Sequence, residues 1–125
     1  MKRRDDNSDM RTRILRRRYL WKDAEGNVIG RRPGSGKGPL LVLSAHLDTV
    51  FPEGSDVTVT QRDGRHYGKG LGDEARGLAA LLTIVRALEA TQIRTRGDLW
   101  IVATVGDEGL GDLRGVKALF REDGA

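Results

Sequence analysis

Residues 40–52 read Leu40-Leu-Val-Leu-Ser-Ala-His46-Leu-Asp48-Thr-Val-Phe-Pro52, and the rest of the chain is organised around them. Its apolar start is typical of a strand, which carries His46 and Asp48 to its C-terminal end. Residues two apart on an extended chain point to the same side. A carboxylate beside an imidazole fixes the tautomer of the ring and makes it more basic, which suits a metal-binding histidine. The alternative is a surface histidine beside a turn aspartate, and residues further along the chain must decide between the two.

Turns and short strands surround this stretch. We expect the packed part to begin at residues 19–21, and residues 23–27 to form a tight turn in which Gly26 and Asn27 supply the positive φ. A strand over residues 27–32 and a flexible loop over residues 33–38 follow. Alternating valine and threonine predict a half-buried strand over residues 56–62. A turn at Asp63-Gly64 then leads to a return strand that begins at His66.

The second half of the chain alternates helix, strand and helix. A helix is predicted over residues 74–89, with Arg86 and Glu89 outside its apolar face and Gly77 allowing close approach to a strand. The apolar face comprises Leu78, Leu81, Leu82, Val85 and Leu88. Residues 99–105 predict a strand buried on both faces, and residues 112–120 a helix with Asp112 as its N-cap. The two most apolar strands are joined through a helix and should be parallel, so we expect a layered α/β domain with a mixed, largely parallel sheet.

Composition limits the class of protein. The chain has no cysteine, which fits a reducing compartment and excludes disulfides and thiolate metal sites. We find no apolar stretch of membrane-spanning length, and the basic start is not followed by the apolar segment of a secretory signal. We therefore expect a cytoplasmic protein without a membrane partner.

The positive charge is concentrated in residues 1–18. This segment holds eight basic and three acidic side chains, whereas the remaining residues hold fourteen basic and fifteen acidic ones. We interpret it as a basic, disordered arm on a nearly neutral domain. No aromatic residue is interleaved with its arginines, so we do not expect nucleic-acid binding. The alternative, an RNA-binding arm, predicts strongly salt-dependent affinity that disappears when the arm is deleted.

Three acidic motifs follow the predicted strands. His46 and Asp48 end the first apolar strand, Asp73 precedes the helix, and Asp107-Glu108 follow the second apolar strand. In open α/β sheets this edge binds ligands. Neighbouring carboxylates repel one another unless a cation is present, and histidine with carboxylates suits zinc, with manganese or cobalt as alternatives. The alternative roles are helix capping for Asp73 and for Asp107-Glu108, while we interpret the other histidine, His66, as structural.

Together these motifs resemble a known family. The segments are His46-Leu-Asp-Thr-Val, Gly70-Leu-Gly-Asp-Glu-Ala-Arg-Gly77 and Val105-Gly-Asp-Glu-Gly-Leu-Gly111. They resemble the di-zinc aminohydrolases and peptidases, which include glutamate carboxypeptidase, acetylornithine deacetylase, succinyl-diaminopimelate desuccinylase, aminoacylase and tripeptide aminopeptidase. The resemblance runs from about Asn27 onward. It implies that residues 19–125 form an incomplete three-layer α/β/α catalytic domain.

The resemblance also implies roles for five residues. His46 would bind one zinc, Asp48 would orient His46, and Asp73 would bridge two zinc ions. Asp107 matches the general base, and Glu108 matches a ligand to one zinc. The implied reaction is hydrolysis of an amide or peptide bond next to a free carboxylate, in a small peptide or an N-acyl amino acid.

The chain departs from the family pattern in three ways. Asp107 stands where the family usually has glutamate, which withdraws the carboxylate by about 1 Å and can lower the rate around a hundredfold. Glu74 stands where the family has Asp or Asn. The family's remaining ligands and its lid and dimerisation domain have no counterpart in the 125 residues. We therefore expect a truncated enzyme that is weak or inactive alone, with an exposed sheet that favours self-association. The alternative is a non-enzymatic fragment or degenerate paralogue with at most loose metal binding.

Overall fold

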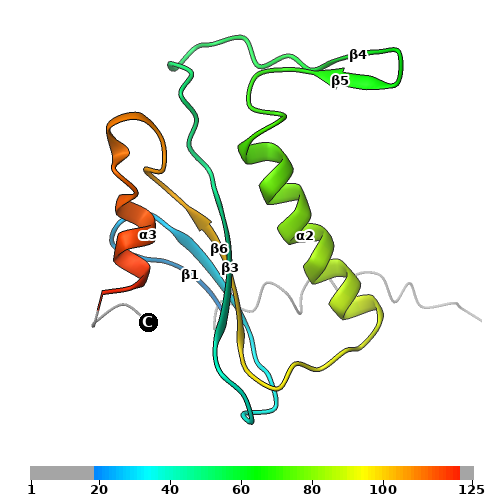
Figure 1. Ribbon diagram of the computed structural model, residues 1–125, viewed down its shortest axis with the longest axis vertical. Helices are drawn as coiled ribbons and strands as arrows, with labels where there is room; N and C mark the ends of the chain where they lie inside the picture. Colours follow the sequence, from blue (N-terminus) through cyan, green and yellow to red (C-terminus); the bar gives the residue numbers. More distant parts are fainter. Residues whose placement is uncertain (1–18, 122–125) are drawn as a thin grey trace, which may run out of the picture.

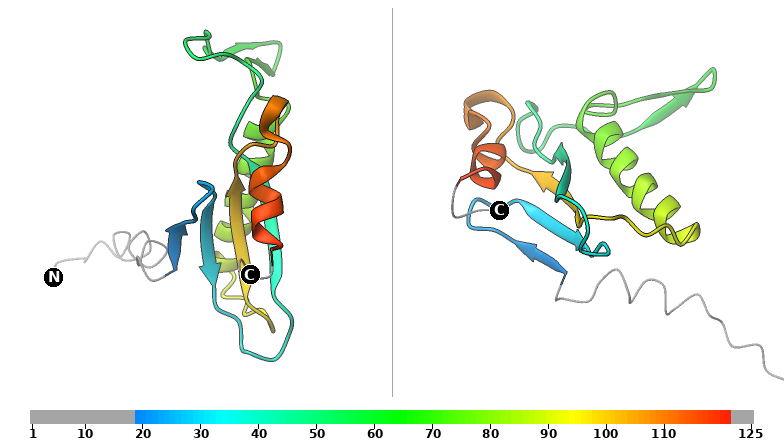
Figure 2. Two further views of the ribbon diagram at one scale, coloured as in Figure 1. Left: turned by 90° about the vertical axis from the view of Figure 1, so that its left-hand side faces the viewer. Right: turned by 60° about the horizontal axis from the view of Figure 1, so that its bottom comes forward.

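A four-stranded mixed sheet forms the centre of the computed structural model, which describes residues 19–121. The predicted basic arm, residues 1–18, lies outside the described residues. The strands lie in the order β1-β2-β6-β3 (Figure 1, and the right-hand view of Figure 2). Their bounds are β1 Leu20–Lys22, β2 Val28–Arg32, β3 Leu41–His46 and β6 Leu99–Thr104.

The pairing of the strands partly matches the prediction. β3 and β6 are parallel, as expected, and they pair in register from Leu41 with Leu99 to His46 with Thr104. The expectation of a largely parallel sheet is wrong, because β1–β2 and β2–β6 are both antiparallel. The tight turn after Lys22 forces β1 and β2 into a hairpin, since only antiparallel strands can be joined so closely.

Helix α2, Glu74–Ala90, packs against β3 and begins at the residue the sequence predicted. A Cβ added at Gly77 would lie 3.1 Å from the Cβ of Ala45, so the expected close approach is confirmed. Leu81 is buried, but Leu82 is 57% exposed, which corrects the predicted apolar face. The buried stripe is narrow because α2 covers mainly one strand of the sheet.

Glu89 is also placed differently from the prediction. Its carboxylate accepts a hydrogen bond from Nε of Arg32 at 2.8 Å, so this side chain faces β2 rather than solvent alone.

Among residues 19–121, we find no helix with the length and apolar character that a membrane span requires.

Helix α3, Arg114–Leu119, lies on the opposite side of the sheet from α2 (Figures 1 and 2). Its Leu119 packs with Ile29 and Val102 in a buried core, against which Val42 and Trp100 also lie. β6 is therefore buried by side chains on both faces, as its apolar sequence predicted.

The predicted capping of α3 by Asp112 is wrong. Asp112 and Leu113 both adopt left-handed backbone, with φ of 50° and 56°, after the short 3-10 helix η1, Gly109–Gly111. α3 therefore begins later than predicted and has no side-chain cap. The Asp112 carboxylate instead forms an ion pair with Lys117 at 2.7 Å.

A two-stranded hairpin of β4, Thr60–Arg62, and β5, Arg65–Tyr67, stands away from the main sheet (Figure 1). The predicted turn is confirmed, since Asp63 and Gly64 have φ of 50° and 70°. The prediction of a half-buried strand over residues 56–62 is wrong, because only residues 60–62 are strand and Val57 is 67% exposed. Alternation predicts burial only where a second layer covers the strand, and this hairpin projects beyond the sheet (Figure 2).

Candidate metal centre

The parallel pairing of β3 and β6 brings the predicted site residues to one edge of the sheet. His46 is the last residue of β3 and lies opposite Thr104, the last residue of β6. Asp73 immediately precedes α2, and Glu108 lies in the loop after β6. One potential ligand atom from each of His46, Asp73 and Glu108 lies within 4.8 Å of the other two. One imidazole and two carboxylates in this arrangement fit a divalent cation.

The His46 ring is held in the orientation that a metal ligand needs. Its Nδ1 lies 2.9 Å from the main-chain carbonyl oxygen of Asp48. A carbonyl can only accept, so Nδ1 carries the hydrogen and, in the neutral ring, Nε2 keeps the lone pair. Nε2 lies 3.4 Å from a carboxylate oxygen of Asp73, on the side of the acidic group.

The surroundings of His46 favour positive charge. Partial burial of the ring opposes its protonated form. The Asp48 carbonyl and the carboxylates of Asp73 and Asp107 outweigh that effect, so the pKa of His46 is raised above its ordinary value. The same negative potential favours a bound cation.

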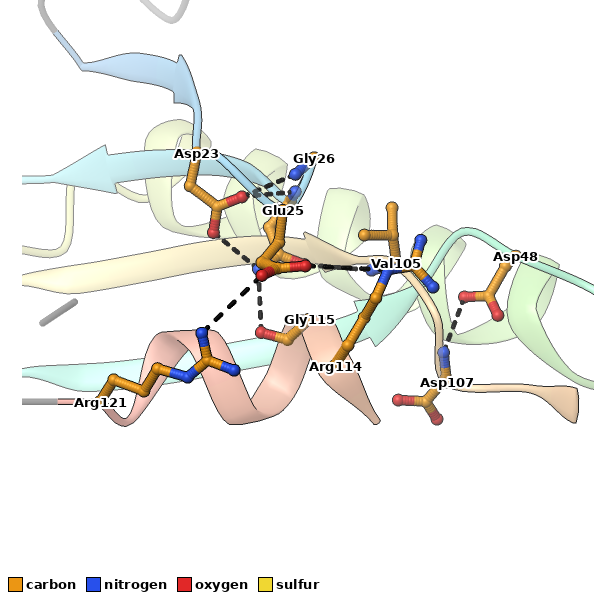
Figure 3. Close-up of polar contacts among 10 residues, drawn as sticks. Asp23, Glu25, Gly26, Asp48, Val105, Asp107, Arg114, Gly115 and Arg121 are labelled. Atoms are coloured by element: carbon orange, nitrogen blue, oxygen red, sulfur yellow. Dashed lines mark hydrogen bonds and ion pairs between the residues drawn. The ribbon is translucent and has the colours of Figure 1, made fainter. Parts of the chain in front are cut away.

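Asp48 links the two strand ends. Its carboxylate lies 3.9 Å from Nδ1 of His46, so the ring is hydrogen-bonded by the Asp48 main chain rather than by its side chain. The carboxylate instead accepts the main-chain NH of Asp107 at 3.2 Å (Figure 3). It also accepts the main-chain NH of Glu108 at 2.9 Å. Burial opposes ionisation, yet these two donors lower the pKa of Asp48 below its ordinary value.

Helix capping does not account for the other acidic side chains. Asp73 occupies the N-cap position of α2 but makes no side-chain capping hydrogen bond, and its side chain is 65% exposed. Glu108 precedes η1 and makes none either. Asp107 is not one of the three clustered ligands, although its charge contributes to raising the pKa of His46. His66 lies in the exposed hairpin opposite Gln61, outside the cluster.

Asn27 is a supporting residue whose sequence position predicted only a turn and the start of a strand. It is fully buried, and its side chain contacts the main chain at the end of β6 and at the start of α3. Of the two turn residues, only Gly26 has positive φ, at 103°. The signal available in the sequence was the alternation along β2, which places Asn27 on the same face as the buried Ile29.

Comparison with known proteins identifies relatives of this chain. Residues 42–125 match the family model described as Peptidase family M20/M25/M40. A succinyl-diaminopimelate desuccinylase of Methylobacillus flagellatus is 34% identical over 91 residues, which are 67% of this chain and 24% of that protein. The enzyme of the same name from Leptothrix cholodnii is 37% identical over 90 residues, 66% of this chain and 23% of that protein.

A third relative extends the similarity further along the chain. A probable succinyl-diaminopimelate desuccinylase of Staphylococcus aureus strain Mu50 is 30% identical over 110 residues, 82% of this chain and 26% of that protein. The chain thus spans about a quarter of the length of the curated relatives it matches.

Proposed function

Since the chain belongs to peptidase family M20/M25/M40, we propose that it supplies part of the catalytic domain of a metal-dependent hydrolase of amide or peptide bonds. The observation that carries this proposal is the convergence of His46, Asp73 and Glu108 within 4.8 Å. These residues come from three separate segments, and neither carboxylate is used for helix capping. Zinc is the metal that best suits the donor set, with manganese and cobalt as alternatives.

Each residue then has a defined task. When bound, zinc supplies a Lewis acid that polarises the scissile carbonyl and makes water easier to deprotonate. Nε2 of His46 and the carboxylates of Asp73 and Glu108 would hold the ion. Asp107 accepts the proton of the attacking water and returns it to the leaving amine. Asp48 holds the main chain of Asp107 and Glu108, which fixes where both carboxylates lie.

We further propose a two-zinc centre in the longer domain, with Asp73 as the bridging ligand. The exposed Asp73 side chain leaves a second oxygen available for another ion. Among residues 19–121 one group of three potential ligands lies close enough to hold an ion, and the second ion would take further ligands beside Asp73. For this reason we expect the isolated 125-residue chain to be weak or inactive. The helices on either side of the sheet would belong to a three-layer α/β/α domain.

The substrate class follows from the relatives. Those named above are desuccinylases, so a small N-acyl amino acid or a short peptide is the proposed substrate. Self-association is the proposed consequence of the free edge of β3, where Leu41 is 56% exposed. The alternative is a fragment without activity that binds metal loosely, which the replacement of glutamate by Asp107 favours.

Equilibrium dialysis against zinc tests the proposal. The wild-type chain should retain zinc, and Glu108→Gln should weaken retention because a neutral amide is a poorer ligand than a carboxylate. Glu53→Gln makes the same chemical change at an exposed turn and should bind like the wild type. Equal retention by both variants would refute the ligand assignment. Zinc-dependent hydrolysis of N-succinyl amino acids that Asp107→Asn abolishes would separate the enzyme from the inactive alternative.

A further inference from the structure

The buried amide of Asn27 connects three segments of the chain. Its Oδ1 accepts a hydrogen bond from the main-chain NH of Val105 at 3.1 Å. Its Nδ2 donates to the main-chain carbonyl of Gly115 at 2.9 Å. Nδ2 also donates to a carboxylate oxygen of Asp23 at 2.7 Å. Each polar group of the side chain is therefore used, as a fully buried amide requires.

Asp23 fixes which way the amide points. Its carboxylate also accepts the main-chain NH groups of Gly26, at 2.9 Å, and Asn27, at 2.8 Å, so it is held firmly in the turn before β2. A flipped amide would turn Oδ1 toward the Asp23 carboxylate and the Gly115 carbonyl, and acceptors would then face acceptors. Only one orientation satisfies all the partners of Asn27.

Two of the partners of Asn27, Val105 and Gly115, flank one segment of the chain. This segment, residues 106–114, connects the end of β6 with the first turn of α3, and it includes Asp107 and Glu108. The NH of Gly115 also donates to the carbonyl of Val105 at 3.0 Å, which closes the segment into a loop. Figure 3 shows Asp23, Gly115 and Val105 around one cluster of hydrogen bonds, with Asp107 and Asp48 beyond Val105.

Close packing at Gly115 leaves no room for a side chain where the loop closes. A Cβ added at Gly115 would overlap Oδ1 of Asn27 and the carbonyl oxygen of Val105, so α3 begins directly against the buried amide. Asp48 holds the NH groups of Asp107 and Glu108 inside the loop. The loop is thus held at its ends by one side chain and at its acidic residues by another.

We propose that Asn27 is a positioning residue for the metal centre, which acts through loop 106–114 on Asp107 and Glu108. The proposal rests on the metal site proposed above, because its consequence is a change in metal affinity. Supporting residues outside the ligand set typically change metal affinity by about 10–100-fold when they are removed. The competing interpretation is that Asn27 only fills the turn before β2 and affects stability alone.

The test compares Asn27→Ala with Leu99→Ala in the full chain. Leu99 is also buried but starts β6 at the opposite end from the loop, so its truncation should destabilise the core without loosening residues 106–114. Two properties are measured: hydrogen exchange of residues 105–115 without metal, and affinity for Zn²⁺ alone. Asn27→Ala should speed exchange in this segment and weaken zinc binding about 10–100-fold. Leu99→Ala should leave the zinc affinity of its folded fraction unchanged.

The outcomes separate the possible failures. Wild-type exchange and zinc affinity in folded Asn27→Ala would overturn the inference, as would an equal loss of affinity in Leu99→Ala. If Asn27→Ala does not fold, Asp23→Ala decides, because it keeps both loop hydrogen bonds but frees the amide to rotate. It should weaken zinc binding several-fold, and wild-type behaviour would overturn the inference. A wild-type chain that binds no zinc would refute the metal site, while the exchange measurement still decides whether Asn27 holds the loop.

Discussion

The carboxylate of Asp48 accepts a hydrogen bond from the main-chain NH of Glu108 at 2.9 Å, and this contact joins the end of β3 to the loop after β6. The main-chain carbonyl of the same residue accepts from Nδ1 of His46. One residue therefore orients the imidazole through its backbone and the acidic loop through its side chain. A substitution at Asp48 should affect both halves of the proposed site.

Asp48→Asn should weaken zinc binding about 10–100-fold, although residue 48 is not one of the three clustered ligands. The amide oxygen can still accept one of the two NH groups, but its NH₂ group would face the other donor. Asp56→Asn is the matched control, since it removes the same charge from an exposed loop residue that is bonded to Thr58. Isothermal titration with zinc gives both affinities. Wild-type affinity in Asp48→Asn would show that the hydrogen bonds of the Asp48 carboxylate do not position the metal centre.

Gly115→Ala should destabilise the protein even though alanine favours helix. The gain in helix propensity is about 1 kcal/mol. A new Cβ would overlap the Asn27 side chain and the Val105 carbonyl, and overpacking of this kind costs about 1–3 kcal/mol. We expect a net loss, measured as a lower midpoint of urea unfolding.

The control for this change is Gly72→Ala. A Cβ at Gly72 meets nothing within 4 Å, and the residue does not have positive φ. Its free energy of unfolding should change by no more than about 0.5 kcal/mol. A Gly115→Ala protein as stable as Gly72→Ala would show that α3 does not begin against the buried amide.

Asp98 should make the stability of the sheet depend on pH. Its carboxylate accepts the NH of Gly34 at 2.9 Å and is paired with Arg31 at 2.6 Å, and these contacts lower its pKa in the folded state. A carboxyl group with a lowered folded pKa contributes stability above its unfolded pKa of about 3.9, and the contribution is lost as the pH falls through the folded pKa. Asp98→Asn should therefore lower the urea midpoint at pH 7.

The same pair of proteins should become equally stable in strong acid. Urea unfolding measured from pH 7 down to about pH 2 checks this expectation. Glu53→Gln, an exposed turn substitution, should leave the midpoint at pH 7 unchanged. If the urea midpoints of wild type and Asp98→Asn do not differ at pH 7, or if their difference grows as the pH falls, Asp98 does not stabilise the sheet through its ionised carboxylate.

The sequence predicted the parts of the fold that depend on apolar patterns. β6 is buried on both faces and pairs in parallel with β3, and the start of α2 was correctly placed, because long apolar patterns report burial directly. The alternation at Val57 and Val59 was misleading, since these side chains alternate on a projecting segment that no second layer covers. The left-handed conformation of Asp112 left no signal in the sequence.

The candidate site also has parts that the sequence could predict and parts that it could not. The convergence of His46, Asp73 and Glu108 could be predicted because each lies at the end of an element, or close to it, at one edge of the sheet. The hydrogen bonds of Asp48 to residues about sixty positions away could not, because they depend on how two loops meet. The burial of Asn27 depends equally on α3 folding back over the turn. Such contacts are tertiary, and local sequence does not specify them.

Zinc titration of the full chain and of its two histidine variants tests whether His46 belongs to a metal centre. The wild type should bind zinc, and zinc at one hundred times its dissociation constant should add about 2.7 kcal/mol to the free energy of unfolding, which a chelator removes. His46→Ala should lose this binding and stabilisation, whereas His66→Ala, altered in the exposed hairpin, should keep both. No zinc binding by the wild type, or binding that survives in His46→Ala, would refute the proposed metal centre.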